Sequence, residues 1–401
     1  MSASALAERI TAARKAAGVS QADAAHHLGM SRPTYIAIEK GAREVKSHEL
    51  LSLAELYRTQ VSRLVRPDAP VPVIAPHLRA EISGAEGDSG VGEALEKLAS
   101  FVDDYRFLLD KTYTRFIPVV PPPAIERSQL SVERVGARVA QDERNRLGLG
   151  EREPIANLRK TLDEVGVQVF ADALNSKLAG LYTFVPGFGY CILVNRLHPL
   201  TRMRWTVAHE YGHFLFDRDK PGVDYVSSPQ RRPEGERFAD AFASNFLMPA
   251  GGVQRHFDDA KARTGDVNVG DVIRIADVYG VSLMAMTLRM EDMRLIQRGT
   301  WDLIKASGAK VGDLKRELGL ESVAPQEKVE TFPRRYLWLA VQAWTSETIT
   351  TSQFAKLVRL SPIEARALAE EISRMVVDDT EELPILKLKL STSVLEREKN
   401  A

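Results

Sequence analysis

The sequence predicts a mainly helical protein with a small β-sheet, of the α+β class, built from several domains. Helical spacing of apolar residues recurs along most of the 401 residues, whereas the strand-like runs are short and few, at 167–171, 181–185 and 190–195. Glycines separate the last two runs, which predicts a β-hairpin. At about 100–200 residues per domain, the length predicts two to four domains.

The composition is ordinary for a soluble globular protein and excludes several classes. Lys plus Arg and Asp plus Glu both number 54, so the formal net charge is 0 and the whole chain is not a general polyanion binder. The single cysteine, Cys191, excludes an intrachain disulfide and a multi-cysteine metal site. No apolar run reaches the roughly 18 residues of a transmembrane helix, and the N-terminus lacks the apolar core of a signal peptide. We therefore expect a cytoplasmic protein with no membrane association.

Two proline-rich segments, RPDAPVPVIAPH and FIPVVPPPAIE, set the expected domain boundaries. We expect a helical domain at 1–66, a linker at 67–128 that includes a long helix at 91–113, a compact domain at 129–295 and a C-terminal helical region at 296–401. Within the compact domain, helices are expected in SVERVGARVAQDERNRLGL and IANLRKTLDEV, and helical periodicity returns at 200–217, 236–248 and 269–295.

The segment RMRWTVAHEYGHFLFD contains an H-E-x-x-H motif formed by His209, Glu210 and His213. Its apolar spacing predicts a helix, and residues four apart on a helix share a face, so both imidazoles can face one metal ion. Glu210 lies beside them, where it can take a proton from a water molecule at the metal. This pattern is typical of a catalytic zinc site, which needs a third protein ligand and one open position.

The third ligand is expected downstream, in ERFADAFASNFLMP. On one helical stripe of this segment, Glu236 and Asp240 stand among small and apolar residues, where a carboxylate needs a partner. We expect Glu236 to be the third ligand and Asp240 to orient a histidine ring, with Glu234 as an alternative ligand. The competing interpretation is a core helix whose histidines hydrogen-bond internally, and it leaves the two acids unexplained.

The segment from about 150 to 250 resembles the ImmA/IrrE family of metallopeptidases. The resemblance rests on three matches in the family's order: ILVN before the motif, then RMRWTVAHEYGHFLF, then ERFADAFASNFLMP. It implies one Zn²⁺ per chain, bound by His209, His213 and Glu236, with Glu210 as general base of metal-assisted peptide hydrolysis.

The chain departs from the family pattern at Tyr211, where the family tends to have Leu. Peptide hydrolysis also needs an oxyanion-stabilising donor, and Tyr211 or Tyr225 could supply it, although each is otherwise an ordinary packing residue. Zinc is preferred over manganese as the metal, although two histidines and a carboxylate accept several divalent ions.

A second motif lies near the N-terminus, in SQADAAHHLGMSRPTYIAIEKG. Two short helices are expected on either side of Gly29, with Ser20 and Ser31 as their N-caps. The arrangement and its flanking helices resemble the Cro/C1-type (XRE) helix-turn-helix family over nearly all of the first 65 residues. These residues hold 9 Lys and Arg against 6 Asp and Glu, a local balance of +3.

In this family the second helix of the motif enters the major groove by its N-terminal end, and basic residues nearby contact phosphates. The resemblance therefore implies contacts with double-stranded operator DNA by Gln21, Ser31, Arg32, Thr34, Tyr35, Lys40 and Arg43. The alternative is that the same fold serves as a protein-interaction module. A further stretch, ITTSQFAKLVRLSPIEARAL, has a weak helix-turn-helix spacing and could bind a partner, dimerise or sense a ligand.

Together the patterns predict a DNA-binding regulator with a zinc endopeptidase domain. We expect it to cleave a helix-turn-helix repressor, or itself, in a stress or mobile-element response, and to form a homodimer that matches a two-fold operator. The alternative is a transcription factor or antitoxin-like regulator whose peptidase fold is a non-catalytic sensor or partner-binding module.

Overall fold

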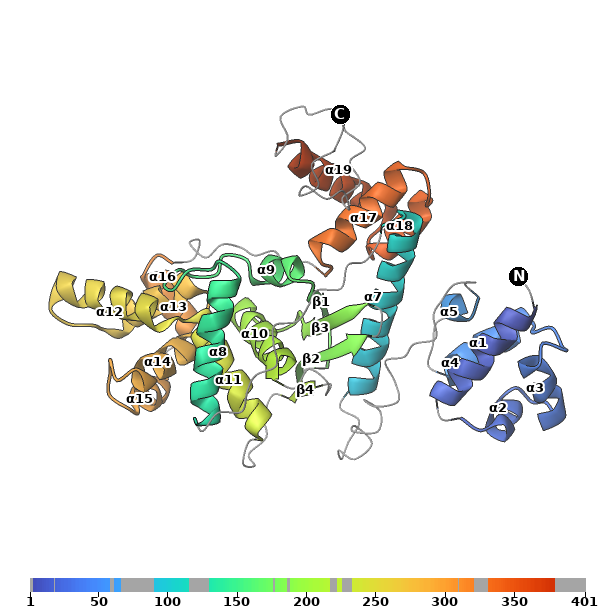
Figure 1. The fold of residues 1–401 in the computed structure, drawn as a ribbon, viewed down its shortest axis with the longest axis horizontal. Coiled ribbons are helices and arrows are strands. Elements are labelled where there is room, and N and C mark those ends of the chain that lie inside the picture. The colour runs from blue at the N-terminus through green and yellow to red at the C-terminus, as the bar shows by residue number, and fades with distance from the viewer. Residues whose placement is uncertain are drawn as a thin grey trace, which may run out of the picture. The chain divides into compact units, whose positions relative to one another are not determined.

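The computed structural model describes residues 3–17, 19–57, 61–65, 90–114, 130–175, 177–185, 188–216, 222–225, 233–308, 310–320 and 331–378. Both proline-rich segments of the sequence lie outside these residues. The chain divides into two compact units, 1–334 and 335–401. The predicted class is confirmed, since helices dominate the described residues and one small sheet accompanies them (Figure 1).

The N-terminal domain, expected to be helical, consists of five helices in the described residues. They are α1 (Ala3–Ala16), α2 (Gln21–His27), α3 (Arg32–Glu39), α4 (Ser47–Leu56) and α5 (Val61–Val65). The side chain of Ser20 accepts a hydrogen bond from the backbone N–H of Asp23, and that of Ser31 accepts one from Thr34, so both predicted caps are present. Gly29 provides the left-handed backbone of the turn, at φ 64°.

The second part of the first unit is built on a four-stranded sheet. Its strands are β1 (Gln168–Asp172), β2 (Leu178–Val185), β3 (Gly189–Asn195) and β4 (Gly222–Tyr225), in the order β1-β3-β2-β4. The predicted hairpin is the antiparallel pair β2–β3, and β1 runs parallel to β3. The long helix α7 (Val91–Lys111), predicted at 91–113, stacks Phe101 on Phe170 of β1 at 5.0 Å between ring centroids.

The other helices of this part lie on the side of the sheet away from α7, and most of them pack on one another rather than on the strands (Figure 1). They are α8 (Val132–Arg146), α9 (Leu158–Glu164), α10 (Leu200–Phe216), α11 (Glu234–Leu247), α12 (Ala250–Thr264), α13 (Val269–Tyr279), α14 (Leu283–Asp292), α15 (Thr300–Ala306) and α16 (Val311–Glu317). The helical stretch expected at 269–295 is two helices. Gly280 turns the chain at φ 62° and Ser282 caps the second helix, so the periodicity continues across a turn.

The C-terminal helices are α17 (Arg334–Thr345), α18 (Thr351–Leu357) and α19 (Pro362–Asp378). The turn between α18 and α19 has the backbone pattern of the turn between α2 and α3. The N–H of Leu360 donates to the carbonyl of Ala355 at 3.0 Å, as Met30 donates to Ala25 at 3.0 Å. The weak helix-turn-helix spacing of the sequence therefore corresponds to a helix-turn-helix in the structure.

Candidate metal centre and nucleic-acid interface

The H-E-x-x-H segment lies in α10, where one turn of helix separates its two histidines. His209 and His213 are buried, and their Nε2 atoms lie 3.0 Å apart. The ring of Tyr182, on β2, stacks on His213 with centroids 5.8 Å apart and planes 5° apart. The sequence analysis missed this tyrosine because periodicity alone does not show which strand residue faces the helix.

Helix α11 brings a carboxylate to both histidines. Glu236 Oε2 lies 3.4 Å from His209 Nε2, and Glu236 Oε1 lies 3.2 Å from His213 Nε2. Hydrogen bonds from His209 and then His213 hold the pKa of the Glu236 carboxyl far below its usual range, against the opposing effect of burial. The folded protein therefore favours the charged form of Glu236.

The neighbouring acids on α11 have different positions. Asp240 Oδ1 lies 3.1 Å from His209 Nδ1, behind the nitrogen that faces Glu236. A carboxylate beside Nδ1 favours the tautomer that carries its hydrogen there, which is the form in which Nε2 can bind a metal. Glu234, the alternative ligand of the sequence analysis, is exposed in the first turn of α11 and lies outside the cluster.

The two helices approach closely because α10 has a glycine where it faces α11. A Cβ on Gly212 would lie 3.0 Å from Cα of Ala239 and 3.1 Å from Cδ1 of Phe242. Such distances are tighter than ordinary side-chain packing, so only glycine permits this spacing without a shift of one helix. The close approach places the Glu236 carboxylate within reach of both rings.

The donor set fits a zinc ion. His209, His213 and Glu236 offer ligand atoms that all lie within 4.8 Å of one another. In a tetrahedral zinc site with bonds of about 2.0–2.1 Å, ligand atoms lie about 3.3 Å apart. The two Nε2 atoms lie 3.0 Å apart, and each has one Glu236 oxygen at 3.4 or 3.2 Å, so the nitrogens and the carboxylate are spaced close to that value. Two neutral imidazoles and one carboxylate also match the ligands zinc accepts.

Glu210 and Tyr211 follow His209 along the helix and differ in environment. Glu210 is fully buried. The hydroxyl of Tyr211 hydrogen-bonds with Glu143 on α8, so of the two roles left open for Tyr211 the structure favours packing in the core. Tyr225 lies in β4, and its side chain is outside the described residues.

In the N-terminal domain, the residues expected to contact DNA differ in their exposure and in their hydrogen bonds within the protein. Ser31, Arg32 and Lys40 are exposed along α3 and at its end. Gln21 donates to Glu39 at 2.7 Å and accepts from Arg32 at 3.4 Å, so it links the two helices of the motif. Thr34 is half-buried in the first turn of α3.

Two further expected DNA contacts, Arg43 and Tyr35, also have partners within the protein. Arg43 forms a two-point ion pair with Glu49, at 2.7 and 3.0 Å. Tyr35 is fully buried, and its hydroxyl hydrogen-bonds with Tyr57 at 2.5 Å and donates to Glu39 at 3.2 Å. The expectation that Tyr35 lies near base edges is therefore wrong, because the residue belongs to the core of the domain.

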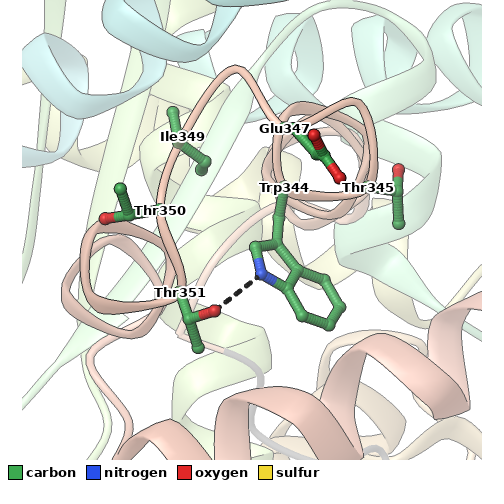
Figure 2. A pocket seen from close by; sticks show the side chains of 6 residues that line it. All are labelled: Trp344, Thr345, Glu347, Ile349, Thr350 and Thr351. Carbon is green, nitrogen blue, oxygen red and sulfur yellow. Dashed lines mark hydrogen bonds between the residues drawn. The ribbon is translucent and has the colours of Figure 1, made fainter.

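The C-terminal unit contains a cavity of about 610 Å³, and none of its lining residues belongs to the histidine cluster. Figure 2 shows the indole of Trp344 hydrogen-bonded to Thr351 within it, at 3.2 Å from Nε1 to Oγ1. Its lining residues are Trp344, Thr345, Glu347, Ile349, Thr350 and Thr351. Mixed polar and apolar walls and the lack of clustered titratable groups give this cavity no evident chemistry.

Fold and site define a protein with two modules, a helix-turn-helix domain and a metallopeptidase-like domain. Residues 5–65 match the family model of a helix-turn-helix domain, and residues 162–291 match the peptidase family described as the IrrE N-terminal-like domain. No curated protein matches the chain. Among solved structures, the crystal structure of ComR from Streptococcus suis aligns at 13% identity over 95% of this chain and 97% of that chain, with a TM-score of 0.16. At that score the alignment supports no argument about this chain.

None of the described helices is long and apolar enough to cross a bilayer.

Proposed function

We propose that the chain is a DNA-binding regulator with a zinc-dependent endopeptidase domain, whose substrate is a helix-turn-helix repressor or the chain itself. The observation that carries the proposal is the convergence of His209, His213 and Glu236 on one point, with Asp240 behind His209. A core helix with internally paired histidines would not need two carboxylates on the facing helix. The domain match at 162–291 supports the same class of protein.

The roles of the residues follow from their contacts. His209, His213 and Glu236 would hold the zinc ion, and Asp240 keeps the His209 ring in the tautomer that binds it. Zinc bound here would act as a Lewis acid that activates water and polarises the scissile carbonyl. Glu210 accepts a proton as the peptide carbon is attacked and gives a proton to the leaving amine nitrogen.

In this proposal the helix-turn-helix domain binds the operator DNA and so brings the peptidase domain to it. Ser31, Arg32 and Thr34 lie at the N-terminal end of α3, which is the end that reads base edges in this motif. Lys40 at the other end contacts a phosphate. A homodimer would place two such helices on a two-fold operator, in a stress or mobile-element response.

The experiment compares wild-type protein with Glu210→Gln. Glutamine keeps the shape of the side chain and removes its capacity to accept a proton. We expect both proteins to bind about one zinc per chain, as a His₂-carboxylate site should. Incubated with candidate helix-turn-helix repressors and with the chain itself, the wild type yields defined fragments by mass spectrometry, and the variant should be at least about 100-fold slower.

One observation favours the alternative of a regulator with a non-catalytic peptidase fold. Glu210 has no exposed surface, whereas a general base must reach water and substrate. The same variant decides between the two. If wild-type protein loaded with zinc cleaves none of the substrates and Glu210→Gln keeps the regulatory output, the domain is a sensor or partner-binding module and the peptidase proposal fails.

A further inference from the structure

Helix α10, which carries the zinc motif, is hydrogen-bonded to helix α8 through Tyr211, a residue that the proposed reaction does not use. Tyr211, which stands where the resembled family tends to have Leu, is fully buried, and its hydroxyl donates to the Glu143 carboxylate of α8. Arg146 Nη2, also on α8, lies 3.2 Å from the same hydroxyl. A leucine could fill the space but could form neither bond.

These hydrogen bonds between α10 and α8 involve the buried charge of Glu143. Glu143 is 3% exposed and pairs with Arg146, whose Nε donates to Glu143 Oε2 at 2.8 Å. A buried carboxylate is costly unless charge and hydrogen bonds compensate it. The Tyr211 hydroxyl supplies one of those hydrogen bonds, so the tyrosine and the ion pair hold each other in a single geometry.

Helix α8 also lies against the helix that carries Glu236. A Cβ on Gly136 of α8 would lie 2.8 Å from the backbone oxygen of Phe238, two residues beyond Glu236 on α11. The two backbones are therefore too close at this point for any residue larger than glycine without a shift of one helix. Helix α8 thus contacts both the histidine helix, through Tyr211, and the Glu236 helix, through Gly136.

We propose that α8 sets the relative position of α10 and α11, and that Tyr211, Glu143 and Arg146 are positioning residues for the metal centre. The inference rests on the proposed zinc function, and it states how the three metal ligands are kept in position. Helix α8 precedes the matched peptidase segment of 162–291, so part of the support for the metal lies outside that segment. Ligands held within a few tenths of an ångström bind a metal more tightly than loosely held ones.

The test uses the full chain and the variant Tyr211→Phe, which keeps the ring and removes the hydroxyl. The matched control is Tyr279→Phe. Tyr279 is buried in the same part of the fold and its hydroxyl donates to the Arg152 carbonyl at 2.9 Å, away from α10. Each variant loses one buried tyrosine hydroxyl, so a general loss of stability should be similar in both.

Two measurements separate positioning from mere packing. Zinc affinity is measured by competition with a chromogenic chelator, and ligand geometry by the visible absorption of the cobalt-substituted protein. We expect Tyr211→Phe to bind zinc about tenfold more weakly, at the low end of effects seen for residues behind metal ligands, and to alter the cobalt spectrum. Tyr279→Phe should match the wild type in both measurements.

Equal zinc affinity and identical cobalt spectra in wild type and Tyr211→Phe would overturn the inference. If Tyr211→Phe does not fold, Glu143→Gln replaces it, because glutamine keeps the volume but weakens the pairing with Arg146; an unchanged site in that variant counts against the inference equally. A wild-type protein that binds no zinc would overturn the proposed function and this inference with it, which distinguishes that failure from the first.

Discussion

At the residue scale, the core of the helix-turn-helix domain contains a charge that determines how its stability depends on pH. Glu39 accepts from Arg14 at 2.6 Å, from Gln21 at 2.7 Å and from Tyr35 at 3.2 Å. Burial alone would raise the pKa of the Glu39 carboxyl, but these three donors outweigh it and the pKa is lowered. The folded domain therefore favours the charged form of Glu39.

This network predicts the effect of Glu39→Gln. At pH 7 the variant should lose about 1–3 kcal/mol of unfolding free energy, because the Arg14 guanidinium loses its charged partner. A lowered carboxyl pKa stabilises the fold above the unfolded value of about 4.3, and this contribution disappears as the pH falls through the lower folded value. The difference between wild type and variant should thus shrink in acid.

Urea unfolding at pH 7, 4 and 3, followed by helical circular dichroism of the N-terminal transition, checks this pH dependence. Glu55→Gln is the control, since Glu55 is exposed on α4 and should change stability by less than about 0.5 kcal/mol. A deficit in Glu39→Gln that is as large at pH 3 as at pH 7 would show that packing, and not the charge, is what Glu39 contributes.

Residue identities were easier to predict from the sequence than residue orientations. His209, His213 and Glu236 were selected from the sequence by helical spacing, together with Asp240 behind them, because positions three and four apart must share a face. Tyr35 was expected near DNA and lies in the core, whereas for Tyr211 the sequence left core packing and oxyanion stabilisation both open. Each is polar at one end, so a local pattern is compatible with either a surface or a core position, and partners distant in sequence, Tyr57 and Glu143, decide between them.

At the element scale, the close contact between α10 and α11 can be tested at Gly212. Alanine there would place a Cβ 3.0 Å from the backbone of Ala239. The helices must then separate, which costs about 1–3 kcal/mol as for other overpacked sites and moves Glu236 away from the histidines. We expect Gly212→Ala to melt at lower temperature and to retain less zinc after dialysis against a weak chelator.

The control for this variant is Gly92→Ala on α7, where an added Cβ meets nothing within 4 Å. Alanine favours a helix over glycine by up to about 1 kcal/mol, so this variant should be neutral or slightly stabilised. Zinc retention in Gly212→Ala equal to that in the control would mean that the helix spacing does not matter for the metal.

Elements with a strong local signal were predicted well, and those that depend on pairing were not. The histidine helix, expected at 200–217, spans Leu200–Phe216, because its periodicity is long and continuous. Strand β4 was missed, since its four residues have no alternation to detect and form a strand by pairing with β2. The stretch at 269–295 was read as continuous helix because the turn at Gly280 preserves the apolar spacing.

The second helix-turn-helix shows why an element does not define a function by itself. The residues of α19 that correspond to Arg32 and Lys40 of the first motif are Pro362 and Glu370. Ile363, beside Pro362, is 81% exposed. Among the described side chains of α19, the exposed charged residues are Glu364, Arg366, Glu370 and Glu371, so this part of the helix has no excess of the positive charge that holds a protein on DNA. The shared backbone geometry therefore says nothing in favour of DNA binding by the C-terminal unit.

At the scale of the whole molecule, the total charge is neutral although the N-terminal domain is positively charged. The N-terminal 65 residues have 9 basic and 6 acidic side chains, while the chain as a whole has 54 of each. Any affinity for DNA should accordingly come from the helix-turn-helix domain and be sensitive to salt. The metal centre is built from α10 and α11 with charges that are compensated locally, so it should not contribute.

Lys40→Ala tests whether the affinity for DNA comes from the helix-turn-helix domain. Lys40 is exposed at the end of α3, where the motif contacts phosphates. With a fluorescent duplex of arbitrary sequence, titrated between about 50 and 200 mM salt, its loss should weaken binding and reduce the slope of log affinity against log salt by about 1. Zinc content should stay at the wild-type value.

The control is Lys305→Ala, which removes an exposed lysine from α15 and should leave both DNA binding and zinc content unchanged. If the two lysine variants weaken DNA binding alike, the affinity comes from diffuse charge, and the helix-turn-helix domain is then better explained as a protein-interaction module.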